Sequence, residues 1–91
     1  MNIHDMVVQE LLDKKSVSAL IYLIEHGREL EFKAGEKNCF ISKNGSERKF
    51  SLWTEKNEQS FNSMEELIEK SKIDGISFLD IWNKVEIETL F

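Results

Sequence analysis

The dipeptide Asn44-Gly45 stands between two short segments, residues 38–43 and 48–54, in which apolar and polar side chains alternate. A dipeptide of this kind between alternating segments is the strongest short-range signal of a β-hairpin. If the two residues form the whole loop, residues whose numbers sum to 89 lie opposite one another. This register places four residues on one face of the hairpin: Cys39, Ile41, Phe50 and Leu52. The chain must therefore contain antiparallel sheet.

The same register puts Phe40 and Trp53 on the other face, among Ser42, Lys49 and Ser51. A face with two large aromatic side chains is either covered by another element or is a contact surface. We expect a helix to cover it, because the helices of this chain have apolar stripes to bury.

Two helical segments precede the hairpin. Ile3, Val7 and Leu11 recur every fourth residue, which predicts an amphipathic helix ending near residues 14–15. Ser16 is placed to cap a second helix over residues 17–24, and Gly27 can adopt the left-handed conformation that ends it. No proline separates the two segments, so one long kinked helix is the alternative.

Residues 29–33 alternate as a first strand, and helical patterns return after the hairpin. Ser63 and Glu66 have the spacing of a capping box, Asp74-Gly75 breaks the chain, and Ser77 can cap a last helix. Residues 85–89 alternate as a closing strand. We expect one α+β domain over residues 1–91, in the order α-α-β-β-β-α-α-β, with helices packed on a three- to four-stranded antiparallel sheet.

The net negative charge of the chain comes from its C-terminal part. Residues 1–53 hold eight acids and eight bases, so the net charge of −5 comes from nine acids and four lysines in residues 54–91. An acidic surface favours a basic protein partner and, with a pI near 5.0, argues against binding DNA or RNA. The longest apolar run is too short to span a membrane, and the N-terminus lacks the pattern of a secretory signal, so we expect a cytoplasmic protein.

Few residues of the chain are suited to nucleophilic catalysis or metal binding, and they are scattered along the sequence. Cys39, His4 and His26 lie on three different predicted elements, and no pair of them has zinc-ligand spacing. We expect Cys39 to be a buried thiol in the core and His26 to be a polar residue in the last turn of a helix. The acids around the capping box read as solvent-exposed helix faces. We therefore predict no enzyme activity, no catalytic residue, no metal and no cofactor.

Four segments of the C-terminal half show a likeness to other proteins: Phe61-x-Ser63-x-Glu65-Glu66-Leu67-Ile68, Lys72-Ile73-Asp74-Gly75, Ile81-Trp82 and Val85-Glu86-Ile87. They resemble the C-terminal half of a group of short uncharacterised bacterial and prophage proteins. The residues concerned cap and pack elements, so the resemblance implies a fold and a bacterial or phage origin, and it implies no activity.

The charge asymmetry predicts a non-catalytic protein-binding module of the inhibitor or immunity kind, monomeric or weakly dimeric. Its acidic C-terminal part would meet a basic patch on the partner. The candidate binding residues are Glu65, Glu69, Glu58, Glu55, Phe40 and Trp53. Two alternatives are a phage anti-defence protein that mimics DNA with rows of carboxylates, and a structural subunit that pairs with itself through the Phe40 and Trp53 face.

Overall fold

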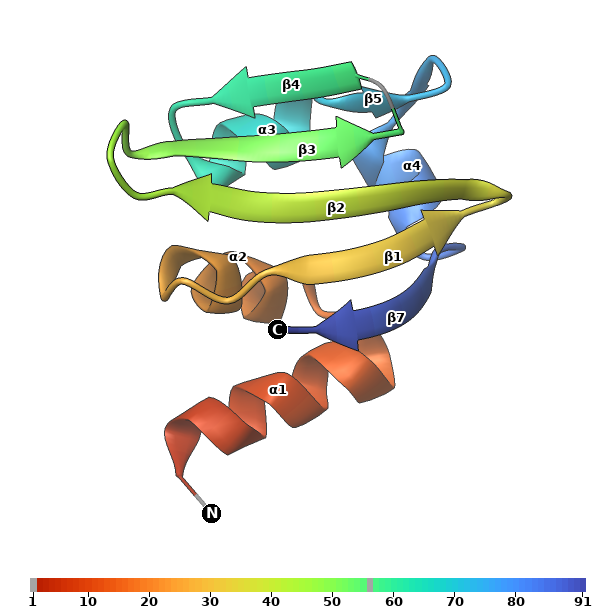
Figure 1. Ribbon diagram of the computed structural model, residues 1–91. Helices are drawn as coiled ribbons and strands as arrows, with labels where there is room; N and C mark the ends of the chain where they lie inside the picture. Colours follow the sequence, from red (N-terminus) through yellow and green to blue (C-terminus); the bar gives the residue numbers. More distant parts are fainter. Residues whose placement is uncertain (1, 56) are drawn as a thin grey trace.

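A five-stranded antiparallel sheet organises the computed structural model, which describes residues 2–55 and 57–91 (Figure 1). Its strands lie in the order β4-β3-β2-β1-β7. The sheet strands are β1 (Leu30–Ala34), β2 (Lys37–Asn44), β3 (Lys49–Thr54), β4 (Asn57–Phe61) and β7 (Glu86–Leu90). The helices are α1 (Ile3–Lys14), α2 (Val17–Glu25), α3 (Met64–Lys70) and α4 (Phe78–Trp82). The expected α+β class is confirmed, although the sheet has more strands than the three or four predicted.

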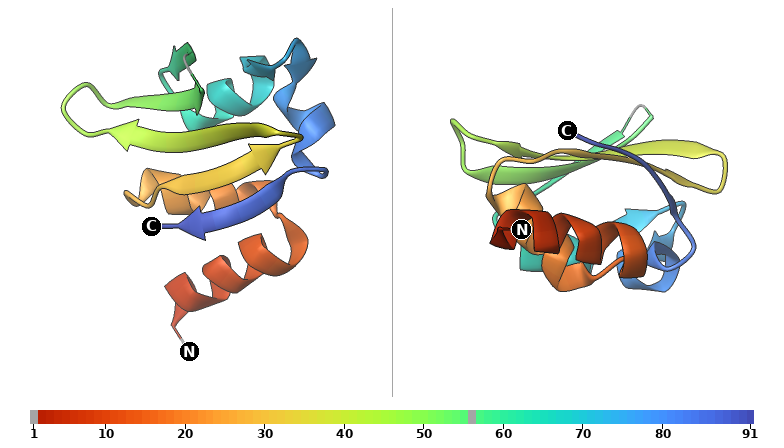
Figure 2. Two further views of the ribbon diagram at one scale, coloured as in Figure 1. Left: turned by 45° about the vertical axis from the view of Figure 1, so that its right-hand side comes forward. Right: turned by 90° about the horizontal axis from the view of Figure 1, so that it is seen from below.

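All four of these helices lie on one side of the sheet, as the view along its edge shows (Figure 2, right). The side chains between helices and sheet form the hydrophobic core. Burying these apolar stripes against one inner sheet face is what stabilises the two layers. The apolar residues with no exposed surface are Leu11, Leu20, Leu23, Ile24, Leu30, Phe32, Ile41, Leu52, Met64, Leu67 and Phe78.

The first two helices are separate. Lys15 adopts a left-handed conformation with φ of 51°, which ends α1. The Ser16 hydroxyl then accepts a 3.2 Å hydrogen bond from the Ala19 amide and caps α2, as its position predicted. The alternative of one long kinked helix is therefore wrong.

The hairpin of β2 and β3 differs from the prediction in its register. Asn44 pairs with Lys49, so opposite residues sum to 93 and four residues form the loop. The Asn44 side chain accepts hydrogen bonds from the amides of Ser46 and Glu47 at 3.2 and 3.4 Å, which stabilises this longer turn. Because the shift from 89 to 93 is even, each side chain keeps its predicted face.

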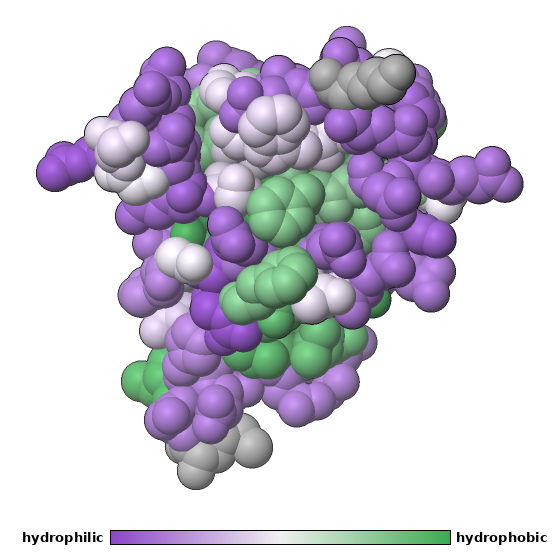
Figure 3. Space-filling model, in the orientation of Figure 1, coloured by the Kyte–Doolittle hydropathy of each residue, from purple (hydrophilic) through white to green (hydrophobic). Residues whose placement is uncertain are grey.

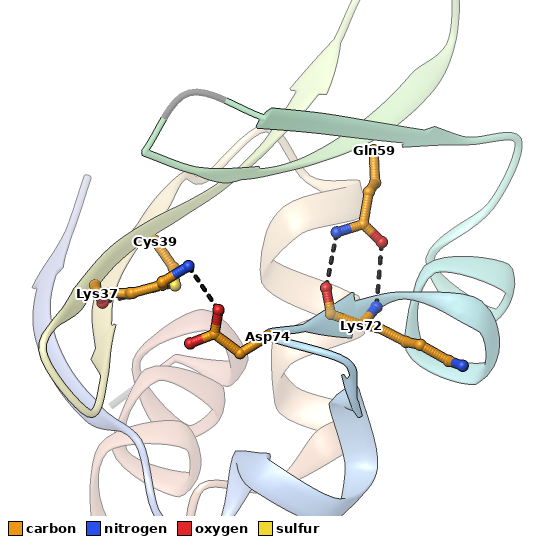
Figure 4. A network of polar contacts seen from close by, with 5 residues as sticks. All are labelled: Lys37, Cys39, Gln59, Lys72 and Asp74. Atoms are coloured by element: carbon orange, nitrogen blue, oxygen red, sulfur yellow. Dashed lines mark hydrogen bonds and ion pairs between the residues drawn. The ribbon is translucent and has the colours of Figure 1, made fainter.

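Three strands, β4, β5 (Lys72–Ile73) and β6 (Ile76–Ser77), were not predicted. β4 is a polar edge strand, in which the alternation of apolar residues that identifies a strand is missing. The Asp74-Gly75 break is the turn of a small second sheet of β5 and β6. Gln59 joins β4 to β5, because its side chain donates to the Lys72 carbonyl at 2.7 Å and accepts from the Lys72 amide at 3.0 Å (Figure 4).

Among the described residues, no helix combines the length and the apolar character needed to cross a membrane.

Candidate protein-binding site on the outer sheet face

The outer face of the sheet, opposite the helices, carries Phe40 and Trp53. These two residues are direct register partners on β2 and β3, and Trp53 is 40% exposed. Our expectation that a helix covers this face is wrong. The helices lie on the inner side of the sheet, where α2 contacts β2 and α3 contacts β3 and β4, and where the alternate residues Ile41 and Leu52 are fully buried.

A third aromatic residue joins this face at the end of β7. The ring of Phe91, which is 55% exposed, lies 6.1 Å from the ring of Phe40 in an edge-to-face arrangement. The Phe91 amide donates a 2.8 Å hydrogen bond to the Glu29 carbonyl, and the Arg28 side chain donates to the Phe91 carbonyl. We call Phe40, Trp53 and Phe91 the aromatic cluster. In the space-filling view of this face, hydrophobic atoms gather at the centre with hydrophilic atoms around them (Figure 3).

Sequence analysis missed Phe91 because β7 contains an irregularity. Phe32 pairs with Ile87 but Glu31 pairs with Thr89, so one extra residue lies between these positions on β7. Such a bulge reverses the faces of the residues that follow it. The simple alternation of residues 85–89 puts Thr89 on the same face as Ile87 and gives no sign of this reversal.

Carboxylates flank the aromatic cluster in one register row across four strands. Glu58 on β4 pairs with Trp53, Trp53 pairs with Phe40, and Phe40 pairs with Glu31 on β1. We call these four residues the outer row. Their order is acid, aromatic, aromatic, acid, so Trp53 and Phe40 each have a glutamate as a neighbour on the same face.

The Glu58 carboxylate is held in place by neighbouring hydroxyls. The Ser51 hydroxyl donates a 2.7 Å hydrogen bond to Glu58 Oε2, and the Ser60 hydroxyl lies 3.4 Å from the same oxygen. Ser51 is itself buried on β3 between its neighbours. A carboxylate held this way loses less conformational entropy on meeting a partner than a free surface acid does.

The structure divides the predicted binding residues between two faces. Phe40, Trp53 and Glu58 come together on the outer face, and Glu55 follows the end of β3. Glu65 and Glu69 are exposed on α3, which belongs to the helical layer on the opposite side of the sheet. The acids of residues 54–91 therefore do not form one continuous surface.

The two histidines, His4 and His26, were predicted on different elements, and both lie beside Tyr22. The Tyr22 ring stacks on His26 at 4.0 Å and lies 6.2 Å from His4. His4 Nε2 is 2.7 Å from the Arg28 guanidinium, so this nitrogen acts as an acceptor, and His26 Nδ1 is 2.7 Å from the Tyr22 carbonyl. The contacts of His4 join α1 to α2 and to the segment before β1, whereas those of His26 stay at the end of α2.

Cys39 is a core thiol, as predicted. It is 2% exposed on β2, and burial raises the pKa of its thiol. A raised pKa leaves little of the thiolate that acts as a nucleophile. Lys37, two residues earlier, forms a 2.5 Å ion pair with Asp74 (Figure 4), and this hydrogen bond and charge raise the pKa of Lys37.

An open groove of about 600 Å³ runs between α1 and α2 and is lined by apolar side chains including Ile3, Met6 and Val7. Among residues 2–55 and 57–91, no three side chains of His, Cys, Asp or Glu gather in a way that could hold a metal ion.

Comparisons of the chain with protein-family models, with curated proteins and with solved structures gave no match.

Proposed function

We propose that this chain is a non-catalytic protein-binding module that receives its partner on the outer sheet face. The observation that supports the proposal is the aromatic cluster, in which Trp53 and Phe91 are exposed and Phe40 is half-buried, at the centre of a face that no helix within residues 2–55 and 57–91 covers. A contiguous exposed apolar patch with a polar rim is typical of an interaction site, and tryptophan is enriched among the residues that contribute most to binding.

The proposed partner is a basic protein. Glu58 and Glu31 lie beside the aromatic residues of the outer row, and the chain as a whole carries a net charge of −5. Charges at the rim of an interface accelerate association with a partner of opposite sign and reject partners of the same sign. A bacterial or phage origin and an inhibitor or immunity role belong to this proposal, and the sequence resemblance supports the former.

The test compares two double variants of the immobilised protein. Phe40→Ser with Trp53→Thr removes the aromatic centre of the outer face, whereas Glu65→Gln with Glu69→Gln removes acids from α3. Proteins bound from the native cell extract are identified, purified and measured against each variant. We expect the outer-face variant to weaken binding more than tenfold, because central aromatic residues contribute at least about 2 kcal/mol each, and the α3 variant to stay within about twofold.

The opposite pattern would move the site to the acids of α3 and overturn the proposal. Two further outcomes would favour the alternatives. A mass that rises with concentration and falls in the outer-face variant would indicate self-association, and displacement of the partner by duplex DNA would indicate mimicry of DNA.

A further inference from the structure

The geometry of the outer row specifies more than a basic partner, and the inference below rests on the proposed function. Adjacent strands of a sheet lie about 4.8 Å apart. Glu58 and Glu31 are separated by three such steps, through Trp53 and Phe40. The Cα atoms of these two glutamates are therefore about 14 Å apart along the row, with Trp53 and Phe40 between them.

Each end of the row matches a guanidinium group better than an ammonium group. At one end, Glu58 is the register partner of the exposed Trp53, and the Ser51 hydroxyl of the adjacent row fixes Glu58 Oε2. A planar guanidinium can stack on an indole while its N–H groups reach a carboxylate at the ring edge, and an ammonium has neither the plane nor the fork of donors. At the other end, Phe40 and Glu31 repeat the pair of ring and carboxylate.

The closest cation along the same strand belongs to the adjacent row. Lys33 follows Glu31 by two residues on β1, and its register partners are Asn38 and Glu86. The single ion pair between side chains in residues 2–55 and 57–91, Lys37 with Asp74, lies outside the outer row. The charge of the outer row itself is thus that of its two acids.

We propose that the outer row binds an extended segment of the partner with two arginines four residues apart and an apolar residue midway between them. In an extended chain, residues i, i+2 and i+4 point to one side, and the first and last are about 13 Å apart. This spacing matches the backbone spacing of the two glutamates and puts the middle side chain over Phe40 and Trp53. The partner class is an Arg-x-apolar-x-Arg segment, and Lys in place of Arg fits less well.

The probes are three blocked pentapeptides: Arg-Ser-Leu-Ser-Arg, the same peptide with both arginines replaced by lysine, and Arg-Arg-Leu-Ser-Ser. The last has the same charge and composition as the first but the wrong spacing. Each peptide is titrated into isotopically labelled protein, and the indole N–H signal of Trp53 reports binding. We expect the first peptide to bind about two- to fivefold more tightly than either of the others, which is the effect of one exposed cation–π contact.

The variants assign the effect to the outer row. Glu58→Gln and Glu31→Gln should each remove most of the advantage of the first peptide, and Glu65→Gln, which removes an acid from α3, should leave it unchanged. Equal affinity for all three peptides, or an equal effect of the three variants, would overturn the inference.

The inference and the proposed function can fail separately. If no peptide shifts the Trp53 signal while capture of the natural partner still depends on Phe40 and Trp53, the arginine motif is wrong and the outer face remains the binding site. If capture is also insensitive to those two residues, both proposals are wrong.

Discussion

Trp82 Nε1 donates a 2.7 Å hydrogen bond to the backbone carbonyl of Lys15, which lies 67 residues earlier in the chain. The Lys15 ammonium in turn donates to the carbonyls of Asn83 and Val85. These reciprocal bonds connect the corner between α1 and α2 to the corner between α4 and β7. They also explain why a lysine holds a left-handed conformation there, since both its backbone carbonyl and its side chain have partners on the same distant segment.

Trp82 should be the most sensitive of the tryptophans to substitution. It is 4% exposed, stacks on Phe78 at 5.2 Å and meets Phe32 edge-on at 5.7 Å. Trp82→Ala should lower the free energy of unfolding by about 3–5 kcal/mol, and Trp82→Phe, which keeps a ring but loses the bond to Lys15, by about 1–3 kcal/mol. Urea unfolding monitored by circular dichroism measures both. Trp53→Phe on the exposed face is the control and should cost under about 0.5 kcal/mol.

The outer face should tolerate substitutions that the inner face does not. Leu52 and Trp53 are adjacent on β3 and point to opposite faces, one fully buried and the other 40% exposed. Leu52→Ala should cost about 2–5 kcal/mol, whereas Trp53→Thr, which keeps a β-branched residue in the strand, should change stability by less than about 1 kcal/mol. A large loss of stability in Trp53→Thr would show that the aromatic cluster serves folding rather than binding.

The four-residue hairpin loop and a two-residue loop differ in the effect expected of Gly45→Ala. Gly45 is not left-handed in this loop and a Cβ at its position meets no atom within 4 Å, whereas Arg48 has φ of 54°. Gly45→Ala should therefore be neutral or stabilising by up to about 1 kcal/mol, and Arg48→Gly should cost little. In a two-residue loop of type I′, Gly45 would have positive φ and the alanine variant would lose about 1 kcal/mol. Thermal unfolding of the two variants separates the alternatives.

Stability should fall at alkaline pH because of Cys39. Burial raises the pKa of its thiol in the folded state, so above about pH 9 the unfolded chain releases this proton and the folded chain keeps it. The unfolded state then binds fewer protons, which lowers the free energy of unfolding as pH rises. Denaturant unfolding at about pH 8 and about pH 10 measures the loss. Cys39→Ala should reduce the slope, and an unchanged slope would contradict a buried thiol as its source.

Local features of the sequence determined much of the secondary structure. The caps at Ser16 and Ser63 bond the Ala19 and Glu66 amides as their spacing predicts, and Gly27 has the left-handed φ of 89° that ends α2. The alternation in residues 38–43 and 48–54 assigned every side chain of the hairpin to its face. These features are readable because caps and periodicity depend on residues within one or two turns of the chain.

The tertiary structure alone decided where β7 pairs and which sheet face stays open. β7 lies beside β1 rather than at the β4 edge, and its bulge brings Phe91 to Phe40, 51 positions away in sequence. The four helices of the described residues all lie on the inner side of the sheet, so the aromatic cluster faces solvent. For the same reason, the acids of residues 54–91 are divided between the sheet and the helical layer. Which strands pair, and on which side of the sheet the helices pack, depend on how the whole chain buries the most apolar surface. A local sequence pattern does not contain this information.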